Sequence, residues 1–318
     1  MSDLDTLIQV ALRLAGDDSP MRERAGVGGG SISQAVRLRT ERGAYLLKTG
    51  GRGLPGFFAA EARGLELLAA AGAVRVPAVL AYQDADLGAG DVGLGAGAPA
   101  QAPGPKPQAP RQGFILLEWL DPPPRADRAS AGELLGTQLA ALHRATAPAY
   151  GLDRDNYIGA TAQPNGWLPS WTAFFRERRL RFQAGLARRN GLLAGERARR
   201  LERLIERLDR WIDDALVQPA LLHGDLWGGN FIVGPGGAPA LIDPAAYYGD
   251  READLAFTTL FGGFPESFYR AYQAAWPLPP GWRERRDLYN LYHLLNHLNL
   301  FGEGYGSQVD AVLARYVG

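Results

Sequence analysis

The chain has 318 residues, of which 46% are apolar, and its 34 basic side chains balance its 34 acidic ones. The length suffices for one large core or two modest ones, and the neutral balance disfavours nucleic acid and anionic membranes as partners. The absence of cysteine excludes disulfides, thiolate zinc sites and catalytic thiols. The acidic start and the lack of a long apolar run predict neither a signal peptide nor a membrane span, so we expect a soluble, cytoplasmic protein of two domains.

The first elements expected along the chain form a small sheet with a helix before it. Periodicity predicts a short amphipathic helix over residues 4–15 and two strands at 32–39 and 44–48. A glycine-rich segment at 26–31 is expected to be a flexible turn beside these strands. From residue 57 to 71 the pattern becomes helical, with four large apolar side chains on one stripe.

Lys48 is unusual because only two of the chain's 34 basic residues are lysines. Lys48 follows the apolar run 45–47. Because arginine has replaced lysine nearly everywhere else in the chain, a lysine at this position suggests that a compact ammonium is required there and not a planar guanidinium. Glu61 lies within the apolar stripe of the predicted helix, where an unpaired carboxylate would be costly. We therefore expect Glu61 to pair with Lys48.

Two further strands, at 78–83 and 113–120, flank a stretch of different composition. Residues 84–112 are rich in Gly, Ala, Pro and Gln and contain no aromatic side chain. Such a segment cannot bury enough apolar surface to offset its ordering entropy, so a mobile loop that is dispensable for folding is predicted. The strands on either side of it are expected to pair as a hairpin.

A proline-rich connection at 121–124 marks the change to a mainly helical second half. This half is expected to begin with a helix whose capping box consists of Ser130 and Glu133. The predicted domains are therefore residues 1–120, including the 84–112 insert, and residues 121–318.

The second half contains the sequence His223-Gly-Asp-Leu-Trp-Gly-Gly-Asn230, followed by two short apolar runs on either side of a Gly/Pro turn. This pattern predicts a β-hairpin, and symmetric pairing of its strands would place Asn230 opposite Asp243, about 5 Å away. A carboxamide oxygen and a carboxylate at that spacing are suited to Mg²⁺. Asp225 lies on the turn, free to face whatever the metal holds.

These residues fit phosphoryl transfer, in which the protein mainly positions the reactants and neutralises charge. Asn230 and Asp243 are predicted to hold Mg²⁺ on the phosphates of a nucleotide. Lys48 would contact the same phosphates, and Glu61 would fix Lys48. Asp225 would receive or orient the proton of the acceptor hydroxyl as the general base.

The pattern His-x-Asp-Leu-x-x-x-Asn, with another aspartate thirteen residues later, resembles the catalytic loop and metal-binding aspartate of protein kinases, with Gly224 where kinases usually have arginine. The longer motifs at 223–230, 242–257 and 261–265 resemble the fructosamine kinase (ketosamine 3-kinase) family. The similarity extends over nearly the whole chain apart from the insert.

This resemblance implies an α+β, two-lobed protein-kinase-like fold. The N-terminal lobe would be an antiparallel sheet with one key helix, and the C-terminal lobe would be mainly helical and carry the catalytic hairpin. The resemblance further implies an enzyme that uses ATP and Mg²⁺ to phosphorylate a sugar hydroxyl of a ketosamine. Its substrate would be a glycated lysine or a free glycated amine, which makes the activity a deglycating repair. The residues leave open the preferred sugar (fructosamine, ribulosamine or erythrulosamine) and the oligomeric state.

The glycine-rich segment would contribute to the nucleotide site. Gly28, Gly29 and Gly30 would let backbone amides approach the phosphates, and Ser31 belongs to the same predicted set. Some members of the family carry a cysteine at the position of Ser31, so a disulfide switch in this loop is excluded here.

Other roles are carried over from the resemblance. The backbone of Glu118 and Leu120 would bind adenine as the hinge does in kinases, and Asp254 would brace the catalytic loop. Trp227 and Asp250 are expected near the acceptor pocket, where Trp227 would either stack on a sugar or pack beneath the loop.

Three other functions are compatible with part of the sequence. A kinase of the aminoglycoside or choline type shares the short motifs but not the longer ones. A metal-dependent phosphoesterase usually needs several converging histidines, whereas this chain has only four, and His293 and His297 are expected to serve helix packing. A catalytically inactive nucleotide-binding module is disfavoured because all five polar residues of the expected site are present.

Overall fold

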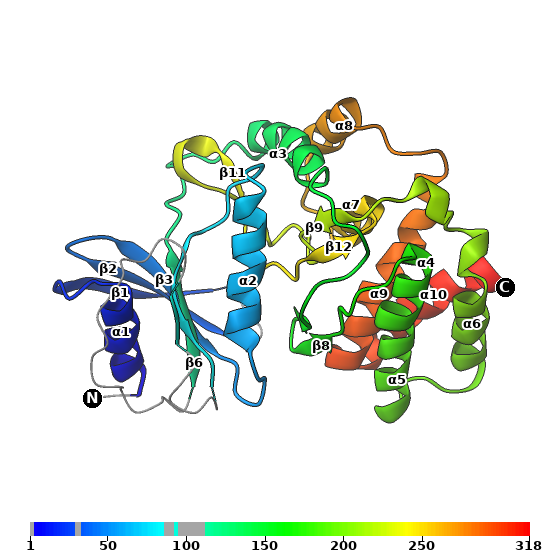
Figure 1. Cartoon of the computed structure of the whole chain (residues 1–318), viewed down its shortest axis with the longest axis horizontal. Helices are drawn as coiled ribbons and strands as arrows, with labels where there is room; N and C mark the ends of the chain where they lie inside the picture. The colour runs from blue at the N-terminus through cyan, green and yellow to red at the C-terminus, as the bar shows by residue number, and fades with distance from the viewer. Residues whose placement is uncertain (1–2, 29–32, 86–91, 95–111) are drawn as a thin grey trace. The chain divides into compact units, whose positions relative to one another are not determined.

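The computed structural model describes residues 3–28, 33–85, 92–94 and 112–318, which form two compact units (Figure 1). The first unit contains Met1–Asp127 and Ile232–Pro244, and the second contains Arg128–Phe231 and Ala245–Gly318. The predicted domain boundary after residue 120 remains a prediction, because a compact unit need not be an independent domain. Within the described ranges, no helix is both long and apolar enough to cross a membrane.

The first unit is built on a six-stranded antiparallel sheet in the order β1-β2-β3-β6-β4-β5. The strands are β1 (Met21–Val27), β2 (Gln34–Thr40), β3 (Ala44–Gly50), β4 (Val79–Gln83), β5 (Val92–Leu94) and β6 (Gly113–Glu118). β4 and β6 pair directly, which confirms the hairpin expected on either side of the insert.

Two helices lie on opposite faces of this sheet (Figure 1). Helix α1 (Asp3–Leu14) buries Leu7, Ile8 and Leu12 against a face that includes Leu47 of β3. Because neighbouring side chains in a strand point to opposite faces, Lys48 projects to the other face, which helix α2 (Phe57–Ala70) covers. The alternation of side chains along β3 therefore places Lys48 on the face of the sheet that α2 covers.

Two expectations for the first unit are wrong in part. Gly26 and Val27 belong to β1 rather than to a turn, and β1 escaped the sequence analysis because as an edge strand it is mostly exposed. The insert is not structureless throughout, since residues 92–94 form β5. Asp84, at the start of the insert, is buried and accepts hydrogen bonds from the amides of Phe58 (2.6 Å) and Ala59 (3.2 Å), so it caps α2.

The second unit is mainly helical, as predicted. Its helices are α3 (Arg128–Leu142), α4 (Trp171–Phe174), α5 (Phe182–Arg189), α6 (Gly195–Glu206), α7 (Arg251–Leu260), α8 (Glu266–Ala275), α9 (Trp282–Phe301) and α10 (Gly306–Val317). Its short antiparallel ribbons pair β7 (Asn156–Ile158) with β8 (Thr161–Gln163), and β9 (Ala220–Leu222) with β12 (Tyr247–Gly249).

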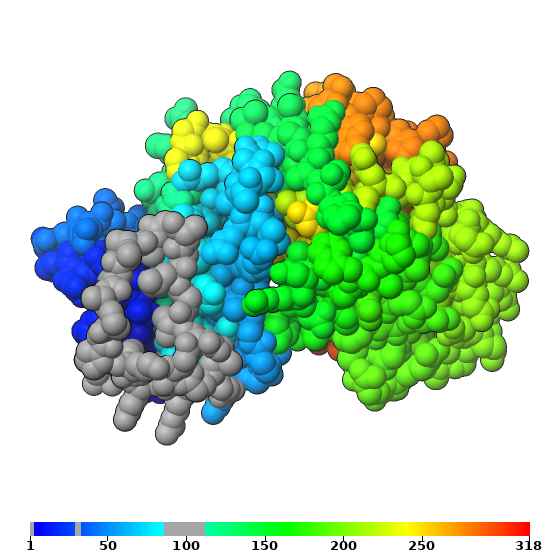
Figure 2. All heavy atoms as spheres, viewed as in Figure 1, coloured from blue at the N-terminus to red at the C-terminus, as the bar shows by residue number. Residues whose placement is uncertain are grey.

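Helices α3 and α8 pack against each other at the surface of the second unit, where α8 is orange in Figure 2. A Cβ atom at Gly136 of α3 would lie 2.3 Å from the Phe268 carbonyl of α8, so glycine permits this close approach. The capping box expected at Ser130 is wrong, because α3 already begins at Arg128 and Ser130 lies in its first turn.

The expected hairpin after the catalytic motif is present. β10 (Phe231–Val233) and β11 (Pro239–Leu241) form a two-stranded ribbon. The turn between them is closed by a 2.8 Å hydrogen bond from the Gly234 amide to the Ala238 carbonyl.

Deleting residues 86–110 should leave a folded protein. The deletion retains the Asp84 cap and the direct β4–β6 pairing, and removes only the edge strand β5 from the described sheet. Thermal unfolding followed by circular dichroism should show one cooperative transition, lowered by no more than about 2 °C, equivalent to about 1 kcal/mol in a chain of this length. Loss of the transition would show that the insert is required for folding.

Candidate active site

In the first unit, Lys48 lies between two carboxylates. Its Nζ atom is 2.7 Å from Glu61 Oε1 and 2.9 Å from Asp243 Oδ1. Lys48 is on β3, which is bonded on both sides within the sheet, and Glu61 is on α2, so the ion pair fixes the helix to the sheet. The predicted contact between Lys48 and Glu61 is confirmed, and Asp243 is a second partner that the sequence had assigned only to the metal.

The electrostatics of this trio favour a charged lysine. Although burial alone would favour the neutral amine, the negative charges of Glu61 and Asp243 raise the pKa of Lys48 above its ordinary value. Burial raises the pKa of Glu61, and the like charge of Asp243 adds to the rise. One ammonium is thus shared by two carboxylates, and an additional cation at this position would be stabilised.

Asp243 differs from Lys48 and Glu61 in its backbone conformation and in the exposure of its side chain. Among the described residues it is the one non-glycine with positive φ, at 55°, a conformation that side chains with a Cβ atom adopt rarely. The Asp243 side chain is 40% exposed, whereas those of Lys48 and Glu61 are each 10% exposed. Asp243 is therefore the member of the trio that solvent, or a ligand, can reach.

In the second unit, the turn after β9 is held by Asp254 of α7. Asp254 accepts hydrogen bonds from the amides of His223 (2.7 Å) and Gly224 (2.9 Å). Gly224 has φ of +79°, and a Cβ atom there would lie 2.1 Å from the Ala245 carbonyl, so only glycine fits. This brace is the role expected of Asp254.

The same turn orients Asp225. Its amide donates to Nδ1 of His223 at 3.3 Å. The Asn230 Nδ2 group donates to the Asp225 backbone carbonyl at 2.8 Å and to Asp225 Oδ2 at 3.1 Å. The direction of these bonds turns the carboxamide nitrogen of Asn230 toward Asp225, and the carboxamide oxygen is the atom with the chemistry of a cation ligand.

Asp254 is in turn contacted by His143, the residue that follows α3. His143 Nε2 lies 3.3 Å from Asp254 Oδ2, and His143 Nδ1 lies 2.9 Å from the hydroxyl of Tyr272 on α8. All three side chains are buried. Sequence patterns did not single out Tyr272, because contacts between distant helices leave no local pattern.

The predicted nucleotide-binding residues are partly described. Gly28 is exposed directly after β1, whereas Gly29, Gly30 and Ser31 lie outside the described residues. The Glu118 amide donates to the Ala78 carbonyl (2.9 Å). The Glu118 carboxylate accepts hydrogen bonds from Arg75 and from the Ala78 amide, so it is held at the end of β6.

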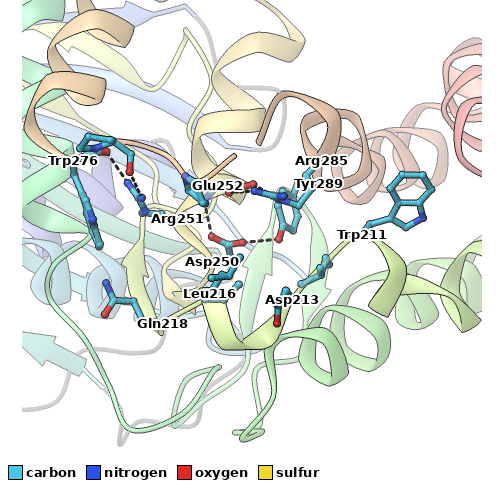
Figure 3. A pocket seen from close by; sticks show the side chains of 14 residues that line it. Trp211, Asp213, Leu216, Gln218, Asp250, Arg251, Glu252, Trp276, Arg285 and Tyr289 are labelled. Atoms are coloured by element: carbon cyan, nitrogen blue, oxygen red, sulfur yellow. Dashed lines mark hydrogen bonds and ion pairs between the residues drawn. The ribbon is translucent and has the colours of Figure 1, made fainter. Parts of the chain in front are cut away.

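The two residues expected near the acceptor differ in their surroundings. Trp227 is 38% exposed and contacts Phe261 edge-on, with 6.5 Å between the ring centroids. Asp250 is buried, accepts a 2.6 Å hydrogen bond from the Tyr289 hydroxyl and caps α7, and burial raises its pKa (Figure 3). In the β9–β12 ribbon, Gly249 pairs with Ala220, at the start of β9, whereas Asp225 follows the other end of β9. Asp250 comes directly after Gly249, so it lies at the opposite end of the ribbon from Asp225. The structure therefore does not support the expectation that Asp250 lies near the acceptor.

Asp250 instead belongs to the wall of a separate cavity of about 250 Å³, shown in Figure 3. Glu252 and Arg285 form a bidentate ion pair in the same wall, at 2.7 and 2.8 Å. The charged groups here are already partnered by the protein.

His293 and His297 serve helix packing, as expected. The His293 ring stacks on Phe257 with 3.5 Å between centroids, and burial lowers its pKa well below the ordinary value. His297 Nδ1 lies 2.8 Å from the His293 carbonyl, within the same helix.

A sheet lysine fixed by a helix glutamate, together with an aspartate turn braced from a helical unit, defines the protein-kinase-like class of phosphotransferases. The structure of a choline kinase from Streptococcus pneumoniae shares this fold, with a TM-score of 0.62 at 15% identity over 99% of this chain and all of that one. A structure from Haemophilus somnus 129PT described as a "putative fructosamine-3-kinase" is more similar. Its TM-score is 0.81 at 27% identity, over 98% of this chain and 97% of that one.

The chain belongs to the fructosamine kinase family, because the family model with that description matches residues 4–318. Curated relatives agree. A "probable ketoamine kinase" of Synechocystis sp. is 39% identical over 309 residues, which are 97% of this chain and 95% of that protein. The chloroplastic protein-ribulosamine 3-kinase of Oryza sativa subsp. indica is 36% identical over 296 residues, which are 92% of this chain and 78% of that protein. The predicted family and the predicted kinase-like fold are confirmed.

Replacing Asp254 with asparagine should destabilise the second unit. One carboxylate oxygen would become an NH₂ group facing either a backbone N–H or His143, and a buried polar group would lose its partner. We expect the free energy of unfolding in urea to fall by about 1–3 kcal/mol. Asp310→Asn, which changes a half-exposed partner of Arg197, is the control and should cost no more than about 1 kcal/mol. Equal stability of Asp254→Asn and the wild type would contradict the brace.

Proposed function

We propose that this protein transfers the γ-phosphoryl group of ATP to a sugar hydroxyl of a ketosamine, the adduct of a reducing sugar with an amine. The observation that carries the proposal is the braced turn that holds Asp225, with the Asn230 carboxamide bonded to its carboxylate. Membership of the fructosamine kinase family supports the same acceptor class.

Lys48 would bind the nucleotide phosphates. It is held charged and oriented by Glu61, which would leave the exposed Asp243 to face a metal ion. Asp243 and Asn230 each carry a hard oxygen donor of the kind that Mg²⁺ prefers and are the residues proposed to hold it, and Mg²⁺ commonly takes only one or two protein carboxylates plus phosphate oxygens. When bound, the metal would supply positive charge against the transferring phosphoryl group.

Asp225 would act as the general base. Its carboxylate takes the proton of the acceptor hydroxyl as that oxygen forms a bond to the γ-phosphorus and the bond to the β-phosphate oxygen breaks, which releases ADP. The bond from Asn230 fixes the orientation of the Asp225 carboxylate. Because the turn is already braced in the structure, little reorganisation would be needed at the moment of reaction.

Adenine would bind the backbone after β6. The amide of Trp119 is engaged by the Ala44 carbonyl (3.2 Å) and that of Glu118 by Ala78, so the carbonyl of Glu118 and the amide of Leu120 are the groups proposed for the base. Gly28, with Gly29, Gly30 and Ser31, is proposed to cover the phosphates with backbone amides.

On the acceptor side, the exposed Trp227 is two residues after Asp225 and offers an aromatic face to a sugar ring. The ketoamine and ribulosamine kinases among the relatives support a ketosamine as the acceptor, and glycated lysine side chains or free glycated amines are the proposed substrates. A deglycating repair role and a cytoplasmic location follow as parts of this proposal.

ADP release with Mg-ATP, measured against ribulosyl-lysine, fructosyl-lysine, an aminoglycoside and choline, tests the function. We expect turnover with one or both ketosamines and none with the other two acceptors. Turnover only with the aminoglycoside or choline would replace the substrate class, and silence across the panel with ATP still bound would favour an inactive nucleotide-binding module.

Asp225→Asn should bind ATP as the wild type does, because Asp225 is assigned to the acceptor. Turnover should fall by roughly 10²-fold to 10⁴-fold, which is the usual contribution of a general base. Calorimetric titration with ATP and the ADP-release assay measure the two properties separately. Unchanged turnover would remove Asp225 from this role.

A further inference from the structure

A line of buried polar side chains leads from Arg251 to the catalytic turn within the second unit. Arg251 Nη1 lies 3.2 Å from the Tyr272 hydroxyl, and that hydroxyl lies 2.9 Å from His143 Nδ1. His143 Nε2 then lies 3.3 Å from Asp254, the carboxylate that holds the amides of the turn. His143 is 0% exposed and Tyr272 is 1% exposed, so these groups depend on one another for hydrogen bonds.

Arg251 at one end of this line can only donate hydrogen bonds, and the carboxylate of Asp254 at the other end can only accept them, so donors and acceptors must alternate in one order between them. A guanidinium has only donors, so the Tyr272 oxygen accepts from Arg251, and its hydrogen is directed to His143 Nδ1. Nδ1 is then an acceptor, which places the imidazole hydrogen on Nε2. Nε2 faces the Asp254 carboxylate, which can only accept. Every bond from Arg251 to Asp254 is therefore satisfied by one arrangement of hydrogens.

The upstream end of the line is fixed. Arg251 also donates to the carbonyls of Trp276 (2.9 Å) and Pro277 (2.7 Å), and its guanidinium carbon lies 3.9 Å from the centroid of the Trp276 ring (Figure 3). Arg251 is thus anchored by three different groups. Burial raises the pKa of Tyr272, so its hydroxyl keeps the hydrogen that the arrangement requires.

The packing of α8 on α3 brings Tyr272 to His143. A Cβ atom at Gly136 would lie 2.9 Å from the Tyr272 amide, so the backbone of α8 passes against α3 at this glycine. His143 is one residue beyond the end of α3, and its ring meets the Tyr272 ring edge-on at 5.7 Å. The position of the hydroxyl is therefore set by the helix packing as well as by its hydrogen bonds.

We propose that Tyr272 is a positioning residue for the phosphoryl transfer: its hydroxyl donates to Nδ1 of His143 and, together with the Asp254 carboxylate on the other side of the ring, holds His143 in place as an Nε2–H donor to Asp254. In the other tautomer a lone pair of Nε2 would face the carboxylate, and the brace on His223 and Gly224 would weaken. A small displacement of the turn moves Asp225 out of its reactive geometry. The inference rests on the proposed role of Asp225 as the catalytic base.

Tyr272→Phe removes the hydroxyl and keeps the ring. We expect kcat to fall about 10-fold, the size of effect seen when outer partners of an active-site residue are lost, with the KM for ATP unchanged. Tyr269→Phe is the matched control, since it removes from the same helix a hydroxyl that bonds Thr258 of α7 at 3.1 Å. Its kcat should equal that of the wild type. Equal kcat values for both variants, or a change in the KM for ATP alone, would overturn the proposal.

The tautomer itself is measurable by NMR with ¹⁵N-labelled histidine, because the chain has only four histidines. The signals of His143, assigned by their loss in His143→Gln, should show the hydrogen on Nε2 in the wild type, and the Nδ1 signal should change in Tyr272→Phe because Nδ1 loses its hydrogen bond. A hydrogen on Nδ1 in the wild-type protein would refute the proposal even if Tyr272→Phe failed to fold. This readout needs no activity, so a wild-type protein inactive on every acceptor would contradict the proposed function and leave the tautomer result to be judged separately.

Discussion

The structure of the first unit depends on one buried ammonium held by two carboxylates. Lys48 contacts Glu61 and Asp243 at 2.7 and 2.9 Å, and these residues come from a strand, a helix and a segment almost two hundred positions away in the sequence. Burying charges is expensive unless each is paired, so any arrangement of the unit that separated these elements would leave an unpaired charge. The trio contains one more carboxylate than ammonium, so its charge is not fully balanced within the described contacts.

In the second unit, the buried carboxylate of Asp254 holds the backbone of a turn. The turn that carries Asp225 has a left-handed glycine and two amides in sequence, which α7 holds through Asp254. Asp254 in turn depends on His143. The position of Asp225 therefore depends on hydrogen bonds to the backbone of the turn, and these bonds come from a residue of helix α7.

Short-range patterns in the sequence predicted much of this. The pairing of Lys48 with Glu61 follows from a carboxylate in an apolar stripe, and the β10–β11 hairpin follows from turn residues between apolar runs. Contacts made over long distances were not predictable. Asp84 looked like the start of a loop, but its carboxylate caps α2. Arg179 lies in an arginine-rich stretch of the sequence, yet it is fully buried and its Nη2 donates to Asn165 Oδ1 at 2.7 Å, because tertiary packing can override a charge pattern. The contact of Asp250 with Tyr289 was likewise not predictable, since Tyr289 is on a distant helix.

The most direct test of the account is the exchange of Lys48 for arginine, with Lys106→Arg, a change at the chain's other lysine, as the control. A planar guanidinium cannot occupy the place of an ammonium between Glu61 and Asp243 without displacing one of them. Calorimetric titration with Mg-ATP and the ADP-release assay should show weakened ATP binding and turnover lowered by roughly 10²-fold or more for Lys48→Arg, the size expected when a donor to the transition-state charge is lost, with no change for the control. Wild-type binding and turnover in a folded Lys48→Arg protein would contradict the assignment of this trio to the phosphates.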